Sequence, residues 1–134
     1  MAVFTNFIEN IQHYYQIADC YLFPVFRATS AIDAPLSVLE AMACNLPIVS
    51  VPVGDVPEVI DGTDGCYLCN QEPADAAEKL HLALSYEKQT NGREKIRYLD
   101  QSNIAKRIIT LYNGLLQEKN RKAKHSTISN GQDG

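Results

Sequence analysis

Glu40 is the residue whose setting first suggests chemistry. It is the only charged residue in a largely apolar stretch, residues 34–47. A carboxylate among apolar side chains needs hydrogen-bond donors, because burying it unpaired is costly. The hydroxyl groups of a ligand would supply such donors, and so would solvent or a structural partner. The residues alone therefore leave two interpretations open, a ligand-binding carboxylate or an ordinary core helix with one polar side chain.

The stretch around Glu40 predicts one helix with defined ends. Pro35 suits a first helical turn, because its missing N–H would have no partner there. Asn45 suits the left-handed residue that closes a helix, and Pro47 prevents continuation. Apolar residues occur all round this helix, so we expect it to be covered on more than one side. Its N-terminus offers free N–H groups and a helix dipole that attract phosphate.

Strand and helix patterns alternate along the chain. Short apolar runs predict strands at residues 20–23, 48–51 and 66–68, and a short strand remnant at residues 3–4, which gives about four strands. Helical spacing predicts further helices at residues 8–19, from 73 to about 87, at 94–99 and at 103–119, with a short one starting near Asp55. The alternation predicts an α/β fold, a Rossmann-like open parallel sheet with helices on both faces. Ligands of such sheets bind beyond the C-terminal strand ends, which here carry residues 24–35 and 52–57.

Length and composition predict one globular domain and exclude several classes. We expect a domain at residues 1–119 and a disordered polar tail at residues 120–134. We expect the last helix of the domain to bury an apolar stripe made by Ile104, Ile108, Leu111, Tyr112 and Leu115. The net charge of −4 gives no basic footprint for nucleic acid. No apolar run approaches the ~20 residues that span a bilayer, and no secretion signal is evident.

The cysteines and histidines suggest structural roles. Cys66 and Cys69 have a spacing found in zinc and redox sites, but Cys20 and Cys44 lie in a predicted strand and in the apolar helix. We therefore interpret all four as small buried hydrophobes and expect no metal and no disulfide. Free thiols favour a reducing compartment, which predicts a cytoplasmic protein. His13, His81 and His125 lack the neighbours of a catalytic triad.

Three linked motifs resemble one enzyme family. They are residues 35–44 (PLSVLEAMAC), 46–49 (LPIV) and 53–60 (VGDVPEVI). They resemble the nucleotide-sugar glycosyltransferases of the GT-B fold, specifically the retaining group known as glycosyltransferases group 1 (family 4). The usual pattern there is a helix ending Glu-Ala-Met-Ala, a strand beginning Pro-hydrophobic-Val, and a Gly-x-x-Pro-Glu turn. The resemblance covers roughly Val3 to Leu116 and only the later part of that family's C-terminal domain.

The resemblance implies a site for the donor substrate. Glu40 matches the second of the family's two glutamates, which implies binding of ribose hydroxyls. Pro35, Leu36 and Ser37 would hold the diphosphate, and the segment of Asn6, Phe7 and Ile8 resembles the turn that lines the base pocket. A nucleoside diphosphate sugar is then the donor substrate, with no metal and no other cofactor. The catalytic groups are unknown here, because the family relies on donor phosphate positioning and on its preceding acceptor domain.

The first of the family's glutamates is missing from its expected place. Eight positions before Glu40 stands Ile32, whose side chain accepts no hydrogen bond. The sugar pocket is either rebuilt by neighbouring polar residues or altered and lost. The candidates for a rebuilt pocket are Asp33, Ser30, Thr29 and Arg27. Asp33 has a second interpretation, as a residue near the start of the helix.

The sequence thus predicts the donor-binding part of a retaining, hexosyltransferase-like glycosyltransferase. The expected reaction moves a sugar from a nucleoside diphosphate sugar to a hydroxyl acceptor, with this chain inactive alone. Its expected partners are the nucleotide sugar and the N-terminal acceptor domain of the parent protein, whose peripheral attachment to a membrane is left open. Two alternatives remain: a non-catalytic Rossmann-like remnant or interaction module with a lost donor site, and a sugar-nucleotide epimerase.

Overall fold

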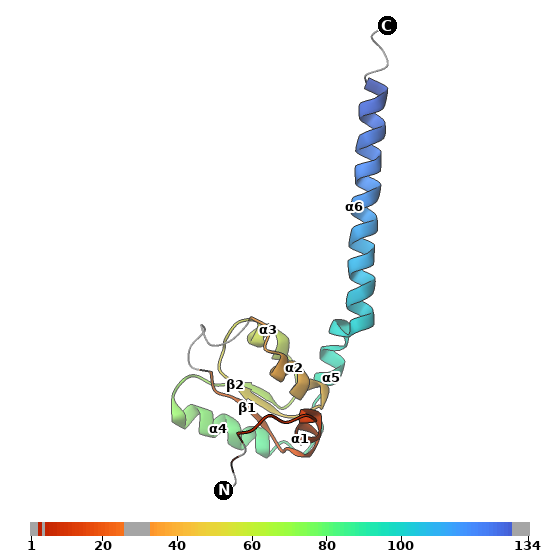
Figure 1. Ribbon diagram of the computed structural model, residues 1–134. Coiled ribbons are helices and arrows are strands. Elements are labelled where there is room, and N and C mark those ends of the chain that lie inside the picture. The colour runs from red at the N-terminus through yellow and green to blue at the C-terminus, as the bar shows by residue number, and fades with distance from the viewer. Residues whose placement is uncertain (1–2, 4, 26–32, 130–134) are drawn as a thin grey trace. The chain divides into compact units, whose positions relative to one another are not determined.

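The computed structural model describes residue 3, residues 5–25 and residues 33–129, with side chains described as far as Lys122. The chain divides into two compact units, Met1–Arg97 and Tyr98–Gly134. The first unit contains the sheet and most of the helices, and the second contains one long helix (Figure 1). The residues that carry the predicted site fall in the first unit.

Three short parallel strands form the sheet of the first unit. They are β1 (Tyr21–Phe23), β2 (Ile48–Ser50) and β3 (Cys66–Leu68), in the spatial order β1-β2-β3. Tyr21 pairs with Ile48, and Ile48 pairs with Cys66, so the strand ends are level. All residues of the central strand are buried. The parallel α/β sheet confirms the predicted fold class, although β1 and β2 are one residue shorter than predicted.

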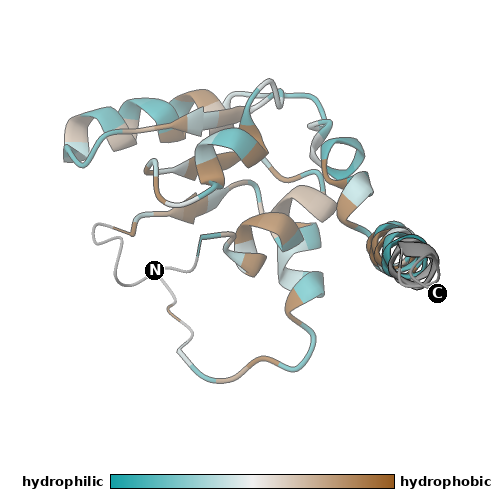
Figure 2. Ribbon diagram, turned by 90° about the horizontal axis from the view of Figure 1, so that it is seen from above, coloured by the Kyte–Doolittle hydropathy of each residue, from teal (hydrophilic) through white to brown (hydrophobic). Residues whose placement is uncertain are grey.

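Helices cover both faces of this sheet. The helices are α1 (Ile11–Ile17), α2 (Leu36–Ala43), α3 (Val56–Ile60), α4 (Pro73–Leu84) and α5 (Gly92–Lys95), followed by a 3-10 turn at Arg97–Leu99. The strands lie between α4 and α2 when seen from above (Figure 2), and α4 contacts β2 and β3 while α2 contacts β1 and β2. Helix α2 also contacts α1 and α5. The prediction that α2 is covered on more than one side is therefore confirmed.

The core lies between β2 and the helices on its two faces. Its largest fully buried apolar side chains are Met42, Ile48, Val38, Val49 and Val56. They come from β2 and from α2 and α3, the helices that the three sequence motifs predict. Burying each such side chain contributes roughly 1.5–3 kcal/mol. The motif residues therefore build the core and place the start of α2 next to the strand ends.

Several predicted helix limits need correction. Helix α1 spans residues 11–17 rather than 8–19. It buries no residue, so it is more exposed than its helical spacing of apolar residues predicted. Pro35 stands one position before α2, as its N-cap with ψ 116°, and not inside the first turn. Helix α4 ends at Leu84, three residues early, because Ser85 and Tyr86 close it by donating to the carbonyl oxygens of His81 and Ala83.

The second unit holds α6 (Gln101–Ser129), which is longer at both ends than predicted. Asp100 caps its start, because the carboxylate accepts the Asn103 N–H and the Ser102 hydroxyl, each over 2.8 Å. Beyond Lys119 the chain contains Arg, Lys and Ala, which are good helix formers, and Glu118 pairs with Lys122 over 2.8 Å. Residues 120–129 are thus helical in the structure. The division into a domain 1–119 and a tail stays a prediction.

Within its own unit most of the apolar stripe of α6 is uncovered, and the burial of this stripe stays a prediction. Leu111 and Tyr112 are each 63% exposed, and Ile108 and Leu115 are about half exposed. The helical spacing correctly indicates one apolar face, and among the described residues of its own unit no second layer covers that face. Among the described helices, none is long and apolar enough to cross a membrane.

Candidate functional site

Two loops at the C-terminal ends of neighbouring strands meet at the predicted site. The first enters α2 after β1, and the second leads from β2 to α3. The Asp55 N–H donates to the carbonyl oxygen of Asp33 over 2.6 Å. Gly54, with φ +52°, approaches Asp33 so closely that a Cβ there would overlap its carbonyl oxygen. The Gly-x-x-Pro-Glu turn therefore supports the loop that leads into α2.

The start of α2 offers backbone donors. The N–H groups of Val38 and Leu39 donate to the Pro35 carbonyl oxygen at 3.1 and 3.3 Å. The N–H groups of Leu36 and Ser37 come before the first position that has a partner within an α-helix. Pro35 has no N–H, so of the three predicted diphosphate residues only Leu36 and Ser37 can donate from the backbone. Leu36 is 64% exposed, which leaves this end of the helix accessible.

Glu40 lies one turn further along α2 and is exposed. Its Oε2 accepts a hydrogen bond from the Tyr15 hydroxyl over 3.2 Å. The pKa of Tyr15 is raised to about 12, first by burial and then by the charges of Tyr21 and Glu40 and the hydrogen bond to Glu40. Tyr15 therefore remains a protonated donor at physiological pH. Since a carboxylate can accept about four hydrogen bonds, Glu40 keeps acceptor capacity for a ligand.

Tyr21 of β1 connects Glu40 to the start of α2. The rings of Tyr15 and Tyr21 meet edge to face with centroids 5.7 Å apart, and Tyr21 stacks on Phe23 at 6.2 Å. Burial raises the pKa of Tyr21, a hydrogen bond from Ser37 lowers it, and the charge of Glu40 raises it again. The Ser37 side chain is thus turned toward β1 at the sheet edge.

The C-terminus of α2 is fixed by a segment from far along the chain. Asn45 adopts φ 54°, the left-handed conformation predicted for it, and the Leu46 N–H returns to the Ala41 carbonyl oxygen over 3.1 Å. The Arg93 guanidinium donates to the Ala43 carbonyl oxygen over 2.6 Å, and its backbone N–H donates to Asn45 Oδ1 over 2.9 Å. A cation at this end also complements the helix dipole. Helix α2 is therefore held at both ends.

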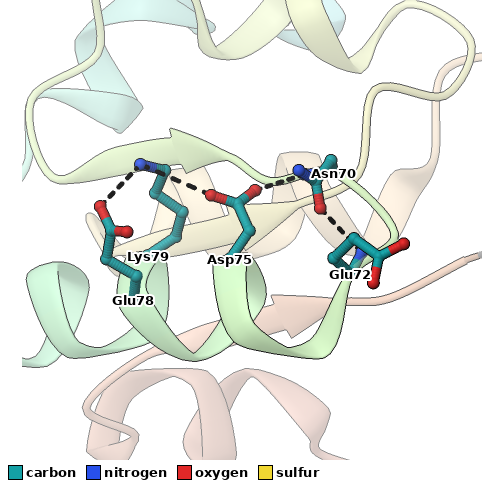
Figure 3. Close-up of polar contacts among 5 residues, drawn as sticks. All are labelled: Asn70, Glu72, Asp75, Glu78 and Lys79. Carbon is teal, nitrogen blue, oxygen red and sulfur yellow. Dashed lines mark hydrogen bonds and ion pairs between the residues drawn. The ribbon is translucent and has the colours of Figure 1, made fainter.

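A separate polar cluster follows β3 and belongs to the start of α4 (Figure 3). The Asn70 N–H donates to Asp75 Oδ2 over 2.6 Å, and the Glu72 N–H donates to Asn70 Oδ1 over 2.7 Å. Lys79 pairs with Asp75 at 3.8 Å and with Glu78 at 3.2 Å. These contacts fix the turn that precedes Pro73. They explain where α4 begins and give this cluster a structural role.

The structure brings together only part of the predicted site. Leu36, Ser37 and Glu40 lie on the first turns of α2, Pro35 is its N-cap, and the backbone of Asp33 lies two positions before Pro35. Asp33 itself has an exposed side chain. Of the predicted base-pocket residues, Phe7 is 91% exposed and Asn6 is also exposed, while Ile8 is partly buried. Arg27, Thr29, Ser30 and Ile32 lie outside the described residues.

The two tyrosines near Glu40 were not among the predicted site residues. Tyr15 falls within the predicted helix at residues 8–19 and Tyr21 within the predicted strand at residues 20–23. A usable signal was the placement of Tyr21 in the strand that precedes Glu40's helix, since a strand packs against the helix that follows it in a βαβ unit. Nothing in the sequence alone relates Tyr15 to Glu40, because the contact depends on how α1 packs on α2.

The thiols of the described residues are free, and burial lowers the acidity of three of them. Burial raises the pKa of Cys66 to about 11 and also raises the pKa of Cys20 and Cys69. A protonated thiol is a poor metal ligand and a poor nucleophile. Within the part of the chain that the structure describes, no cluster of three His, Cys, Asp or Glu side chains is arranged to hold a metal ion.

Comparison with known proteins identifies the family. Residues 2–85 match the family described as glycosyl transferases group 1. The chain is 33% identical over 79 residues to the amylovoran biosynthesis glycosyltransferase AmsK of Erwinia amylovora, covering 58% of this chain and 19% of that protein. It is 28% identical over 74 residues to the D-inositol 3-phosphate glycosyltransferase of Streptomyces bingchenggensis (strain BCW-1), covering 54% of this chain and 15% of that protein. No solved structure matches the chain significantly.

The parallel α/β sheet, with a helix N-terminus at its C-terminal edge, defines a Rossmann-like domain of the kind found in part of a GT-B enzyme. The family match covers more than half of the chain, so the chain belongs to the group 1 glycosyltransferases. It spans less than a fifth of the length of each of the two relatives.

Proposed function

We propose that this chain is the nucleotide-sugar donor-binding part of a glycosyltransferase. The observation that carries the proposal is the exposed carboxylate of Glu40, one turn from the accessible start of α2 at the C-terminal edge of the sheet. In this proposal the N–H groups of Leu36 and Ser37 face the diphosphate, and Glu40 accepts hydrogen bonds from the ribose hydroxyls. Its role is binding and orientation, not proton transfer.

The proposed reaction moves a hexosyl group from a nucleoside diphosphate sugar to a hydroxyl acceptor, with retention. The charge that develops on the leaving diphosphate needs donors fixed in advance, and the start of α2 is such a group of donors. We propose that no metal takes part and that the acceptor is held by an N-terminal domain of the parent protein. We propose a cytoplasmic location. Because the chain spans under a fifth of its relatives, we expect it not to catalyse transfer alone.

The sugar end of the proposed site is the least complete part. Asp33 is exposed and adjoins the second loop through its backbone, which makes it a candidate for the sugar hydroxyls. Arg27, Thr29 and Ser30 remain candidates from the sequence, and Asn6, Phe7 and Ile8 remain candidates for the base. Ile32, in the position of the family's first glutamate, favours a second candidate function: a Rossmann-like interaction module that has lost its donor site.

Calorimetric titration of the 134-residue chain with UDP, GDP and ADP tests the proposal. We expect one nucleotide to bind, and Glu40→Gln to weaken that binding by about 3- to 10-fold, because a hydrogen bond to a charged group is lost at an exposed site. Glu58→Gln is the matched control, since Glu58 is an exposed carboxylate on the neighbouring helix α3. No binding by a folded wild-type chain would instead favour the interaction module.

A further inference from the structure

The hydrogen bond between Tyr15 and Glu40 joins two helices of the first unit. Tyr15 projects from α1 and Glu40 from α2, 25 positions later in the chain. The hydroxyl donates to Oε2 over 3.2 Å. A carboxylate has two oxygens and about four acceptor positions, so one donated bond leaves Oε1 open to other donors. The carboxylate is therefore held from one side and exposed on the other.

The donor is itself held in place by packing. The Tyr15 ring meets the Tyr21 ring edge to face, with an interplanar angle of 74°, and Tyr21 belongs to strand β1. Edge-to-face pairs at this distance are favourable because the positive ring edge meets the negative ring face. Glu40, in contrast, is exposed and has a long side chain that loses much conformational entropy when it is fixed. A rigid phenol beside it restricts the rotation of its carboxylate before any ligand arrives.

We infer that Tyr15 is a positioning residue: its hydroxyl fixes Oε2 of Glu40 so that Oε1 is presented to a ribose hydroxyl of the bound nucleotide. The inference rests on the proposed function, because it names a residue that prepares the same site. Its physical benefit is preorganisation, since a ligand that meets an already oriented carboxylate does not have to order it on binding. Tyr15 itself touches Glu40 and not the ligand.

A purely structural role for Tyr15 predicts something different. If the bond only ties α1 to α2, its loss lowers stability and disturbs binding of any nucleotide equally. If it orients Glu40 toward a ribose hydroxyl, its loss matters only when that hydroxyl is present. The two roles therefore separate in the response to ligands that lack the 2′- or the 3′-hydroxyl.

The test compares Tyr15→Phe with wild type in the full 134-residue chain. This substitution removes the hydroxyl and keeps the ring that packs on Tyr21. The nucleotide that binds wild type, and its 2′-deoxy and 3′-deoxy forms, are titrated by calorimetry, with thermal unfolding as the check on folding. Tyr14→Phe is the matched control, because Tyr14 is the adjacent residue of α1 and is 45% exposed.

We expect Tyr15→Phe to weaken binding of the ribonucleotide by about 3- to 10-fold, as for loss of one bond to a charged group, with Tyr14→Phe equal to wild type. The loss should shrink toward none with one of the deoxy forms and in the Glu40→Gln background. Equal losses with all three ligands, or wild-type binding by Tyr15→Phe while Glu40→Gln is weakened, overturn this inference alone. No nucleotide binding by folded wild type overturns the proposed function as well.

Discussion

Single residues decide the chemistry at the start and middle of α2. Tyr15 and Tyr21 supply polar atoms around Glu40, and both have a raised pKa with burial as the first cause. The neutral phenol of Tyr15 donates a hydrogen bond to the Glu40 carboxylate without adding negative charge beside it. The setting of Glu40 is therefore suited to a carboxylate that accepts neutral hydroxyl donors, which is also what a ribose presents.

Tyr15 makes folding stability depend on pH in the alkaline range. Its pKa rises from an ordinary 10.0 to about 12 in the folded chain, so the folded state favours the protonated phenol. The stability that this gives is fully present below pH 10 and is lost as the pH rises toward 12. Denaturant unfolding at a series of pH values should show a smaller decline over this range for Tyr15→Phe than for wild type. Parallel curves would contradict the prediction.

Cys66 should be a slow nucleophile at neutral pH. Burial raises its pKa to about 11, so its reactive thiolate is scarce until the solution is strongly alkaline. We expect alkylation of Cys66 by iodoacetamide in the folded chain to be much slower than that of unfolded chain at the same pH. Mass spectrometry of digested samples gives the rate for each cysteine. Fast labelling of Cys66 under folding conditions would refute the buried setting.

At the scale of elements, the approach of the two loops depends on Gly54. An alanine there would overlap the Asp33 carbonyl oxygen and come within 2.7 Å of its Cα, and it would also have to adopt φ +52°. We expect Gly54→Ala to cost about 1–3 kcal/mol of stability, as strained backbone does, and to weaken nucleotide binding. Chemical unfolding measures the first effect and calorimetry the second.

Gly62→Ala is the control for Gly54→Ala. Gly62 also has a positive φ, of +60°, but a Cβ there would meet only the movable Lys95 Nζ, at 3.1 Å. It therefore carries the backbone cost without the overlap between loops. If both variants lose the same stability and keep the same nucleotide binding, the contact between the loops does not support the site.

The C-terminus of α2 depends on another glycine in the same way. A Cβ at Gly92 would lie 2.9 Å from the Met42 carbonyl oxygen, so α5 could not pack against α2 as it does. We expect Gly92→Ala to destabilise the chain by about 1–3 kcal/mol, as overpacking does. Gly114→Ala is its control, since nothing lies within 4 Å there, and alanine favours a helix. Thermal unfolding measures both variants. A lower unfolding temperature for Gly114→Ala than for Gly92→Ala would contradict this prediction.

The elements show which parts of the fold the sequence could predict. The Pro35–Pro47 stretch and the turn at Gly54 have strong local signals, because proline, glycine and asparagine have restricted or special backbone preferences, and these elements were predicted nearly to the residue. The hydrogen bonds from Tyr15 to Glu40 and from Arg93 to the Ala43 carbonyl oxygen were not predictable, because they join residues that are 25 and 50 positions apart. Periodicity indicated the apolar face of α6 but not whether that face is covered.

At the scale of the whole molecule, the core is complete without the second unit. The buried core cluster and the apolar side chains packed on it all lie between Tyr15 and Ile96, inside the unit Met1–Arg97. The residues that position Glu40 and the start of α2 lie there too. The stability of the sheet and the proposed donor site should therefore be properties of the first unit.

A chain shortened to residues 1–97 should fold and keep the nucleotide binding of the longer chain. Truncation after Arg97 removes α6, so circular dichroism should lose helical signal while NMR spectra keep the dispersed resonances of the sheet. Nucleotide affinity within about threefold of the 134-residue chain is expected, since the atoms near Glu40 are unchanged. The matched control is a chain ending at Lys119, which keeps most of α6. If residues 1–97 unfold while residues 1–119 fold, the helix stabilises the sheet, and the two units are one cooperative domain.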